Sequence, residues 1–233
     1  MKLHSYLFIL MNCVLSLSAC SVSMVATLRS DQQVDVFFTG SIKPKVASLL
    51  NDLSSSNQKS TGALISAAEI TASFQKVPEL ALVATKDVAP QGLEGRFRIV
   101  DSEKLSQRFL FVQQILVKEE SRFSVTLNRE STSQLLSLFT PEIRDYLDAL
   151  MAPIITGEKL SPADYLTLVT SVYGKTIAQE IASSQITLEV HVPGTICSVL
   201  GGSGSGSKAF FVIPFVDLLV LENPLVYQIA WKP

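Results

Sequence analysis

Alternating apolar and polar residues predict several strands in the first half of the chain. The alternation runs from Val22 to Phe38 and is interrupted by the polar segment Ser30-Asp31-Gln32, which predicts a β-hairpin. Shorter alternating runs follow at residues 80–84, 96–99 and 122–128. Each run has one apolar and one polar face, as expected for strands of an antiparallel sheet that is buried on one side.

Two apolar segments depart from strict alternation. The run Phe109–Val117 is apolar on both sides apart from two glutamines, which predicts a central strand covered on both faces. Residues 210–221 are interrupted by Pro214 and Asp217 and are too short to span a bilayer. We therefore expect two core strands joined by a bend. Contact with lipid, or the lining of a pocket, is the alternative for this segment.

Helical spacing of apolar residues occurs at Val46–Leu53 and again through a helical part at about residues 131–183. Ser131 and Gln134 have the spacing of a capping box, which marks the start of a helix. Residues 62–77 are ambiguous, because their alanine content favours a helix whereas their apolar residues partly alternate.

The clearest helix start in the chain is Ser161-Pro162-Ala163-Asp164. A serine cap, a proline in the first helical position and an acidic third residue all suit the free N–H groups of a helix N-terminus. The apolar residues from Leu166 to Ile181 then keep helical spacing and predict one helix of almost six turns with a buried stripe.

Alternation returns at residues 186–192 and 225–231. Strands, then helices, then strands again predict an α+β fold, with a mainly antiparallel sheet and two to four covering helices. About 210 residues after the leader can form one large domain or two small ones. We expect a single domain over residues 20–233.

Residues 1–19 have the order of a signal peptide: the basic Lys2, an apolar run from Tyr6 to Leu17 and then small residues. A membrane-spanning helix needs about 20 mainly apolar residues, which is more than this run provides. No basic cluster follows the run to stop its transfer. We therefore expect the leader to be removed.

The end of the leader, Leu17-Ser18-Ala19-Cys20, resembles the lipobox of bacterial lipoproteins at all four positions. In that family the cysteine thiol receives a diacylglyceryl group, the preceding peptide bond is cleaved, and the new amino terminus is usually acylated with a chain such as palmitate. The resemblance implies cleavage between Ala19 and Cys20 and a lipid on Cys20. Two or three chains hold a protein stably, because each buried CH₂ contributes about 0.8 kcal/mol. The alternative is an ordinary secretory leader, with an unmodified cysteine at this position.

The charge balance argues against nucleic acid as a partner. Of the 19 basic side chains, Lys2 lies in the leader, so residues 20–233 have 18 basic and 21 acidic side chains and a net charge of −3. This leaves no positive excess for phosphates and no polybasic patch for anionic head groups. Membrane attachment would therefore depend on the lipid, and the 47% apolar and 17% charged residues indicate a globular protein.

Cys197 would be the one free thiol of the mature chain, because Cys13 lies in the leader and Cys20 would carry the lipid. An intramolecular disulfide is then impossible. We expect Cys197 to be buried, since a free cysteine behaves as a small apolar residue. An intermolecular disulfide is the alternative.

The segment from Gly201 to Lys208 superficially resembles a phosphate-binding loop. That motif needs a lysine where Ser207 stands, and it must lead into a helix so that backbone N–H groups face the phosphate. The following residues, 209–214, are strand-like instead. We expect a flexible hairpin loop and no nucleotide site.

His191 is the single histidine outside the leader, and alternation places it beside Glu189 on a polar strand face. No nucleophile motif accompanies it, so we expect an exposed histidine with no catalytic role. With Cys197 it supplies two of the four ligands that structural zinc usually takes, and the chain has no calcium-loop motif. We expect no metal and no cofactor.

Two acidic pairs have spacings at which an acid pair for glycoside hydrolysis can be considered. These pairs are Asp145 with Asp148 and Glu158 with Asp164. Because the first pair belongs to a helix that turns its apolar stripe inward, we expect solvated surface carboxylates. The sequence thus predicts no enzyme.

Two resemblances extend beyond the leader. Thr140-Pro141-Glu142-Ile143, Tyr173-Gly174-Lys175 and Leu221-Glu222-Asn223-Pro224-Leu225 before Trp231 resemble segments of uncharacterised spirochaete lipoproteins. A hairpin directly after the lipidated cysteine, a middle helical part and a last strand ending in tryptophan are similar to the LppM-like lipoproteins of mycobacteria. The first resemblance implies an envelope lipoprotein without assigned activity, and the second implies an α/β domain that binds lipids.

The favoured hypothesis is a lipid-anchored, non-catalytic module of the cell envelope, in which the space between helices and sheet accepts an acyl chain or another apolar ligand. A structural or assembly lipoprotein with an envelope protein partner, contacted through residues 210–221, is the second hypothesis. The anchor would place the domain on the periplasmic or the outer face of a membrane, and both leaflets stay open.

Overall fold

The computed structural model describes residues 21–31, 33–53, 66–89, 91–109, 111–115, 119–137 and 141–232. The predicted leader lies outside these ranges, together with Ala19 and Cys20. Strands, helices and strands follow one another along the described chain, which confirms the predicted α+β class.

The described residues form eleven strands and nine helices. The strands are β1 (Ser21–Leu28), β2 (Val34–Ser41), β3 (Leu80–Val88), β4 (Gly92–Ile99), β5 (Val112–Ile115), β6 (Ser121–Leu127), β7 (Gln185–His191), β8 (Thr195–Leu200), β9 (Ser203–Ser205), β10 (Lys208–Pro214) and β11 (Leu225–Lys232). The helices are α2 (Pro44–Leu53), α3 (Ala67–Phe74), α4 (Ser102–Arg108), α5 (Thr132–Leu136), α6 (Pro141–Leu150), α7 (Ala152–Ile155), α8 (Pro162–Tyr173), α9 (Lys175–Ala182) and α10 (Phe215–Val220). Three of them, α2, α6 and α8, have ten residues or more.

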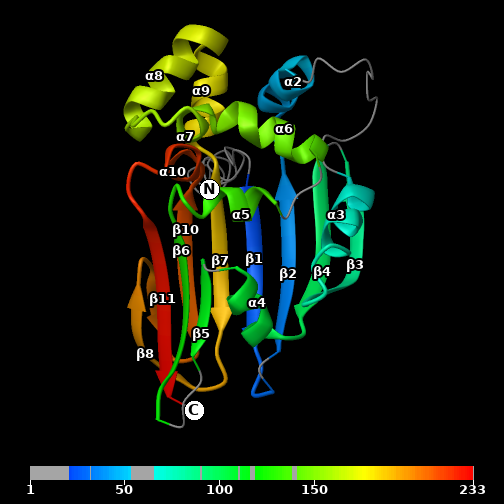
Figure 1. The fold of residues 1–233 in the computed structure, drawn as a ribbon, viewed down its shortest axis with the longest axis vertical. Coiled ribbons are helices and arrows are strands. Elements are labelled where there is room, and N and C mark those ends of the chain that lie inside the picture. Colours follow the sequence, from blue (N-terminus) through cyan, green and yellow to red (C-terminus); the bar gives the residue numbers. More distant parts are fainter. Residues whose placement is uncertain are drawn as a thin grey trace, which may run out of the picture.

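The larger of the two sheets has seven strands in the order β3-β4-β2-β1-β7-β10-β9 (Figure 1). The predicted hairpin is confirmed as β1 and β2, which pair from Ser21 with Ser41 to Leu28 with Val34. All neighbouring strands of this sheet are antiparallel except β1 and β7, which run parallel. β1 therefore lies inside the sheet and is hydrogen-bonded along both edges.

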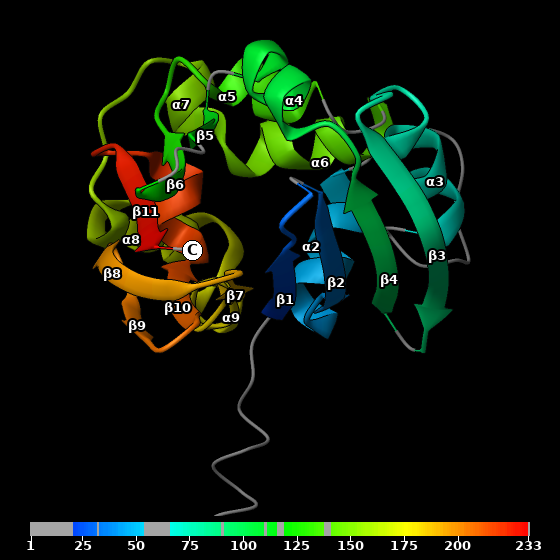
Figure 2. The same cartoon turned by 90° about the horizontal axis from the view of Figure 1, so that it is seen from below.

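A second sheet, in the order β5-β6-β11-β8, lies against one face of the first (Figure 2). Trp231 and Ile229 of β11 pack there against the inward residues of β1, β2, β7 and β10, such as Val36, Val190 and Phe211. Alternation explains this core, because every second residue of a strand points to the same face. Strand β8 lies next to the Gly–Ser segment and was not predicted.

Six helices gather at one end of the sheets: α2, α6, α7, α8, α9 and α10 (Figure 1). Their apolar sides form a separate core with α5. Its most buried members are Val220, Leu219 and Ile181. Tyr165 lies in the same core and donates its hydroxyl to the carbonyl oxygen of Leu150 at 2.9 Å. The helical part predicted at about 131–183 corresponds to α5 through α9.

The predicted six-turn helix is divided into two. Ser161 caps α8 by accepting a hydrogen bond from the N–H of Asp164 at 3.1 Å, as predicted. The helix then ends at Gly174, whose φ of +90° is incompatible with a continuous helix. The change of direction leaves Val172 and Tyr173 exposed, so the prediction of one continuous buried stripe was wrong.

The prediction of a central strand at Phe109–Val117 was also wrong. Its strand part, β5, is the edge strand of the smaller sheet, and Ile115 is 51% exposed. Phe109 and Phe111 are buried because they follow α4 into a local apolar cluster, with ring centroids 5.6 Å apart. Within its described residues, the segment thus contributes apolar side chains to a local cluster and a short strand at the edge of a sheet.

Residues 210–221 form one strand and one helix instead of two strands. β10 ends at Pro214, and α10 follows directly. The helix ends at Leu221, the one non-glycine residue with positive φ in the described chain. The interruptions recognised in the sequence therefore mark a strand-to-helix change, since proline is well tolerated at the entrance of a helix.

Local hydrogen bonds show whether two helix starts have a side-chain cap. Ser66 and Glu69 form a reciprocal capping box at α3, so the described part of the ambiguous 62–77 segment is helical from Ala67. The capping box predicted at Ser131 was wrong, because its side chain makes no cap bond. Its hydroxyl instead donates to the carbonyl oxygen of Asn128 at 2.9 Å.

Glu180 joins two helices that are distant in sequence. Its Oε2 accepts a hydrogen bond from the N–H of Val46 in the first turn of α2 at 3.0 Å. That turn has no acidic residue of its own, so the carboxylate satisfies a free donor and complements the positive helix end.

We expect Glu180→Ala to lower the free energy of unfolding by about 1 kcal/mol, the usual cost of losing such a cap. Urea denaturation followed by circular dichroism would measure this change. Glu158→Ala, at an exposed position, is the control and should change stability by no more than about 0.5 kcal/mol. Equal effects of the two substitutions would contradict the assigned role.

Candidate functional site

The candidate site lies where the chain enters the fold. β1 begins at Ser21, so the residue that would carry the lipid precedes a central strand with no linker between them. Ser21 pairs with Ser41 of β2 and Gln185 of β7. Ser41 leads into α2, and Gln185 follows α9. The chain therefore enters the fold at the end of the sheet where the helices gather (Figure 1).

A cavity of about 390 Å³ opens beside Ser21, between the ends of β2, β3 and β4. We name it the Ser21 cavity. Its apolar lining residues are Ile42, Pro44, Val88, Ala89 and Leu93, and its polar ones are Ser21, Thr39, Ser41, Lys43, Gln91 and Glu94, with Gly40 and Gly92 between them. The volume falls in the lower part of the range of about 300–1,000 Å³ that is common for small-molecule pockets.

Backbone geometry shapes the floor of this cavity. The N–H of Ile42 donates to the carbonyl oxygen of Gln91 at 3.0 Å and ties β2 to the β3–β4 turn. A Cβ atom at Gly92 would lie 2.9 Å from the carbonyl oxygen of Val88 and 3.3 Å from that of Gly40. Glycine is therefore required here for the close approach of three backbone segments.

The face of the seven-stranded sheet that is turned away from the second sheet carries no described helix or strand (Figure 2). The register places Arg98, Asp35, Thr27, His191 and Lys208 in one row across this face. We name it the open face. The charged residues of this row belong to two separate clusters.

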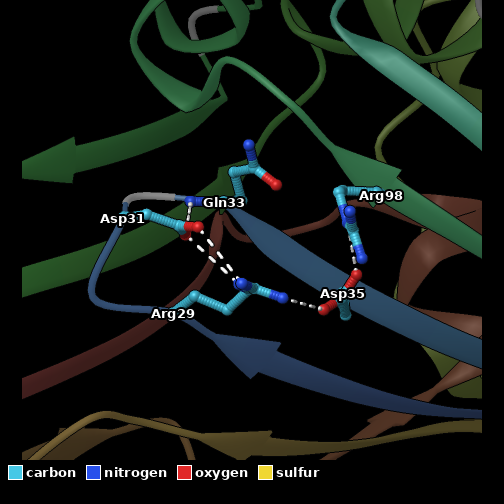
Figure 3. A network of polar contacts seen from close by, with 5 residues as sticks. All are labelled: Arg29, Asp31, Gln33, Asp35 and Arg98. Carbon is cyan, nitrogen blue, oxygen red and sulfur yellow. Dashed lines mark hydrogen bonds and ion pairs between the residues drawn. The ribbon is translucent and has the colours of Figure 1, made fainter.

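The first cluster centres on Asp35 (Figure 3). Its carboxylate accepts from Nε of Arg98 at 2.6 Å and lies 3.4 Å from the guanidinium of Arg29, which also pairs with Asp31 at 3.3 Å. The hydrogen bond from Arg98 holds the pKa of Asp35 below its usual range. The network therefore stabilises the fold above the ordinary aspartate pKa and loses this contribution as the pH falls through the lowered one.

The second cluster contains His191, which the sequence placed beside Glu189 on a polar strand face. Its Nε2 lies 2.6 Å from Oε1 of Glu189, and the ammonium group of Lys208 lies 2.9 Å from the same oxygen. Hydrogen bonds from Lys208 and then His191 lower the pKa of Glu189. His191 is beside Glu189, as predicted, but it is half-buried and not fully exposed. It is oriented by an ion-pair cluster.

Cys197 is exposed, so the prediction of burial was wrong. It belongs to the unpredicted strand β8, and its Sγ lies 3.9 Å from a carboxylate oxygen of Glu120. Ile196 and Val199 of the same strand pack toward the core, which leaves the thiol on the outer side.

The Gly–Ser segment forms a hairpin between β9 and β10, as predicted. Gly206 has a φ of +59° at its turn, and its carbonyl oxygen accepts from the N–H of Ile196 at 2.8 Å. Strand β10 follows in place of a helix, so the structural setting of a phosphate-binding loop is missing from this part of the chain.

The carboxylates of the two acidic pairs lie mainly on the surface, as predicted. Asp145, Glu158 and Asp164 are exposed, and Asp148 is half-buried. Asp164 accepts the hydroxyl hydrogen of Ser161 at 2.7 Å as part of the α8 start. Among the described residues, no group of three or more His, Cys, Asp or Glu side chains could hold a metal ion.

Comparison with solved structures gives a weak likeness. No family model matches the chain, and no curated protein matches it. The folded domain of Mycobacterium tuberculosis LppM, solved by NMR, is similar over 92% of this chain and 90% of its own, with 10% sequence identity and a TM-score of 0.40. These values are too low to assign a family. The spirochaete resemblance stays a prediction.

Within the described ranges, no helix is both long enough and apolar enough to cross a membrane.

The sequence indicated the entry point of the chain but not the Ser21 cavity. The lining of this cavity comes from the ends of β1, β2, β3 and β4, from the β3–β4 turn and from the residues that lead into α2. The one local signal of the cavity in the sequence was the pair Gly40 and Gly92. These glycines allow the backbones of β2 and β4 to approach each other closely, which can be recognised only once the two strands are known to pair.

Proposed function

We propose that the chain is a lipid-anchored lipoprotein of the cell envelope, whose domain binds an acyl chain or a similar apolar group without catalysis. The observation that carries this proposal is the position of Ser21. This residue follows the predicted lipidated Cys20, begins a central strand and lines a cavity of about 390 Å³. The anchor and the candidate binding site therefore share one end of the molecule.

The composition of the Ser21 cavity supports a single-chain ligand. Its apolar side is formed by residues such as Val88 and Leu93, while Lys43, Ser41 and Glu94 give it a polar side. A pocket with apolar walls and a few polar groups suits a ligand with one apolar tail and a polar head. Its volume favours one chain over a two-chain lipid. The space between helices and sheet, where we expected the ligand, is occupied by the helical core.

Palmitate is a suitable probe, and Val88 and Val83 provide a matched pair of variants. Both valines are exposed on strand β3, at 43% and 62%, but only Val88 lines the cavity. We expect Val88→Asp to weaken palmitate binding by about tenfold or more, since a desolvated charge costs more than the 1.4 kcal/mol that corresponds to tenfold. Val83→Asp should bind as the parent does.

Native mass spectrometry and a titration with palmitate would measure this binding, and the mass of the mature amino terminus would report the acyl chains on Cys20. A parent protein that never retains palmitate would refute the binding function. Equal binding by both variants would place the ligand elsewhere.

A further inference from the structure

Three large apolar side chains of α8 are exposed, two of them at the end of the helix that leads to Gly174. Leu168, Val172 and Tyr173 are 45%, 60% and 40% exposed on this helix. Residues 165–174 contain no charged side chain. The helix projects beyond the end of the sheets, on the side where β1 begins (Figure 1). We name these three residues and the hydroxyls around them the α8 surface.

Three hydroxyls around the apolar residues of the α8 surface donate within the helix. Thr167 donates its hydroxyl to the carbonyl oxygen of Ala163 at 3.0 Å, Thr170 to that of Leu166 at 2.7 Å, and Ser171 to that of Leu168 at 2.8 Å. A hydroxyl that bonds back to its own helix does not need water as an acceptor. These three groups can therefore enter a less polar environment with their donors paired.

Charged groups border this surface at both ends. Asp164 is held in the N-terminal cap, and the exposed Lys175 follows the C-terminal end. Lys45, at the start of α2, is also exposed at the helical end. Lysine side chains can lay their methylene stems along an apolar surface and keep the ammonium group among polar head groups.

We infer that the α8 surface lies in the head-group region of the membrane that holds the lipid anchor. The inference rests on the proposed anchoring at Cys20. Because no linker separates Cys20 from β1, the anchor fixes the helical end of the domain close to the bilayer, and α8 exposes large apolar residues at that end. Exposed apolar residues on an uncharged helix segment that is followed by a lysine suit a lipid interface. The Ser21 cavity then opens near the source of its acyl ligand.

The test uses the full chain, processed in cells and reconstituted in phosphatidylcholine and phosphatidylglycerol vesicles that contain nitroxide-labelled lipids. Cys197→Ser removes the exposed thiol, and single cysteines are introduced by Val172→Cys or Val212→Cys and labelled with a fluorophore. Val212 is the matched control, since it is a valine 53% exposed on the open face. We expect lipid quenching to be several-fold stronger at position 172 than at position 212.

Each outcome has a separate meaning. Equally weak quenching at both positions, with acyl chains present on Cys20, would overturn the α8 surface while leaving the anchor intact. Shielding of position 172 from an aqueous quencher without quenching by lipids would assign the surface to a protein partner and overturn the inference. A mature amino terminus without acyl chains would refute both the anchor and the inference.

Discussion

Replacing Cys20 with serine is expected to leave the leader uncleaved and the amino terminus without acyl chains, so that any remaining partitioning into the detergent phase comes from the retained apolar leader. A serine hydroxyl cannot take the thioether-linked diacylglyceryl group that the lipobox resemblance implies, and each CH₂ no longer buried removes about 0.8 kcal/mol of membrane affinity. The mass of the amino terminus measures both effects, and phase separation in a nonionic detergent measures the remaining partitioning.

Cys197→Ser is the matched control, because it removes the exposed thiol of β8 and leaves the lipobox unchanged. Since β1 begins after the substituted residue, Cys20→Ser should leave the far-ultraviolet circular dichroism of the domain unchanged. A Cys20→Ser protein that is still cleaved and still enters the detergent phase would disprove lipid attachment at this position.

Trp231→Ala is expected to lower the free energy of unfolding by about 3–5 kcal/mol. Trp231 is 1% exposed and lies between the two sheets, so its loss leaves a cavity that the paired strands cannot close. Such a loss is a large part of the roughly 5–15 kcal/mol that stabilises a typical domain. Urea denaturation followed by circular dichroism is the measurement.

Trp231→Phe keeps most of the apolar volume and should cost clearly less than the alanine substitution. Val226→Ala is a control on the same strand, since Val226 is 38% exposed, and its effect should be small. If Trp231→Ala were no more destabilising than Val226→Ala, the packing of β11 against the larger sheet would be wrong.

The elements that were predicted correctly are those with local causes. The β1–β2 hairpin follows from alternation around a polar turn, and the start of α8 follows from Ser161, Pro162 and Asp164. The same local reasoning located β7 and β11. These patterns depend on hydrogen bonds and side-chain directions within a few residues.

The incorrect predictions concern features that depend on packing. Phe109–Val117 is apolar, but whether such a segment crosses the centre of a sheet or forms its edge depends on which strands pair with it. Cys197 is exposed because Ile196 and Val199 are the residues of β8 that pack toward the core. The division of the long helix at Gly174 had a local signal, since glycine is a frequent helix terminator.

For the candidate site, the sequence located only the point where the chain enters the fold. Alternation at Val22 placed a strand directly after Cys20, but the partners of that strand are β2 and β7, and Gln185 is far from Ser21 in sequence. The Ser21 cavity also needs the β3–β4 turn. Its existence therefore depends on the arrangement of whole strands and has no motif of its own.

The position of β1 has a mechanical consequence. A force applied through the amino terminus pulls along the axis of this strand, which is hydrogen-bonded to an antiparallel neighbour on one side and a parallel neighbour on the other. Shear along both edges loads the bonds of the two ladders together, whereas peeling would break them one at a time. A domain attached in this way should resist being drawn out by its tether.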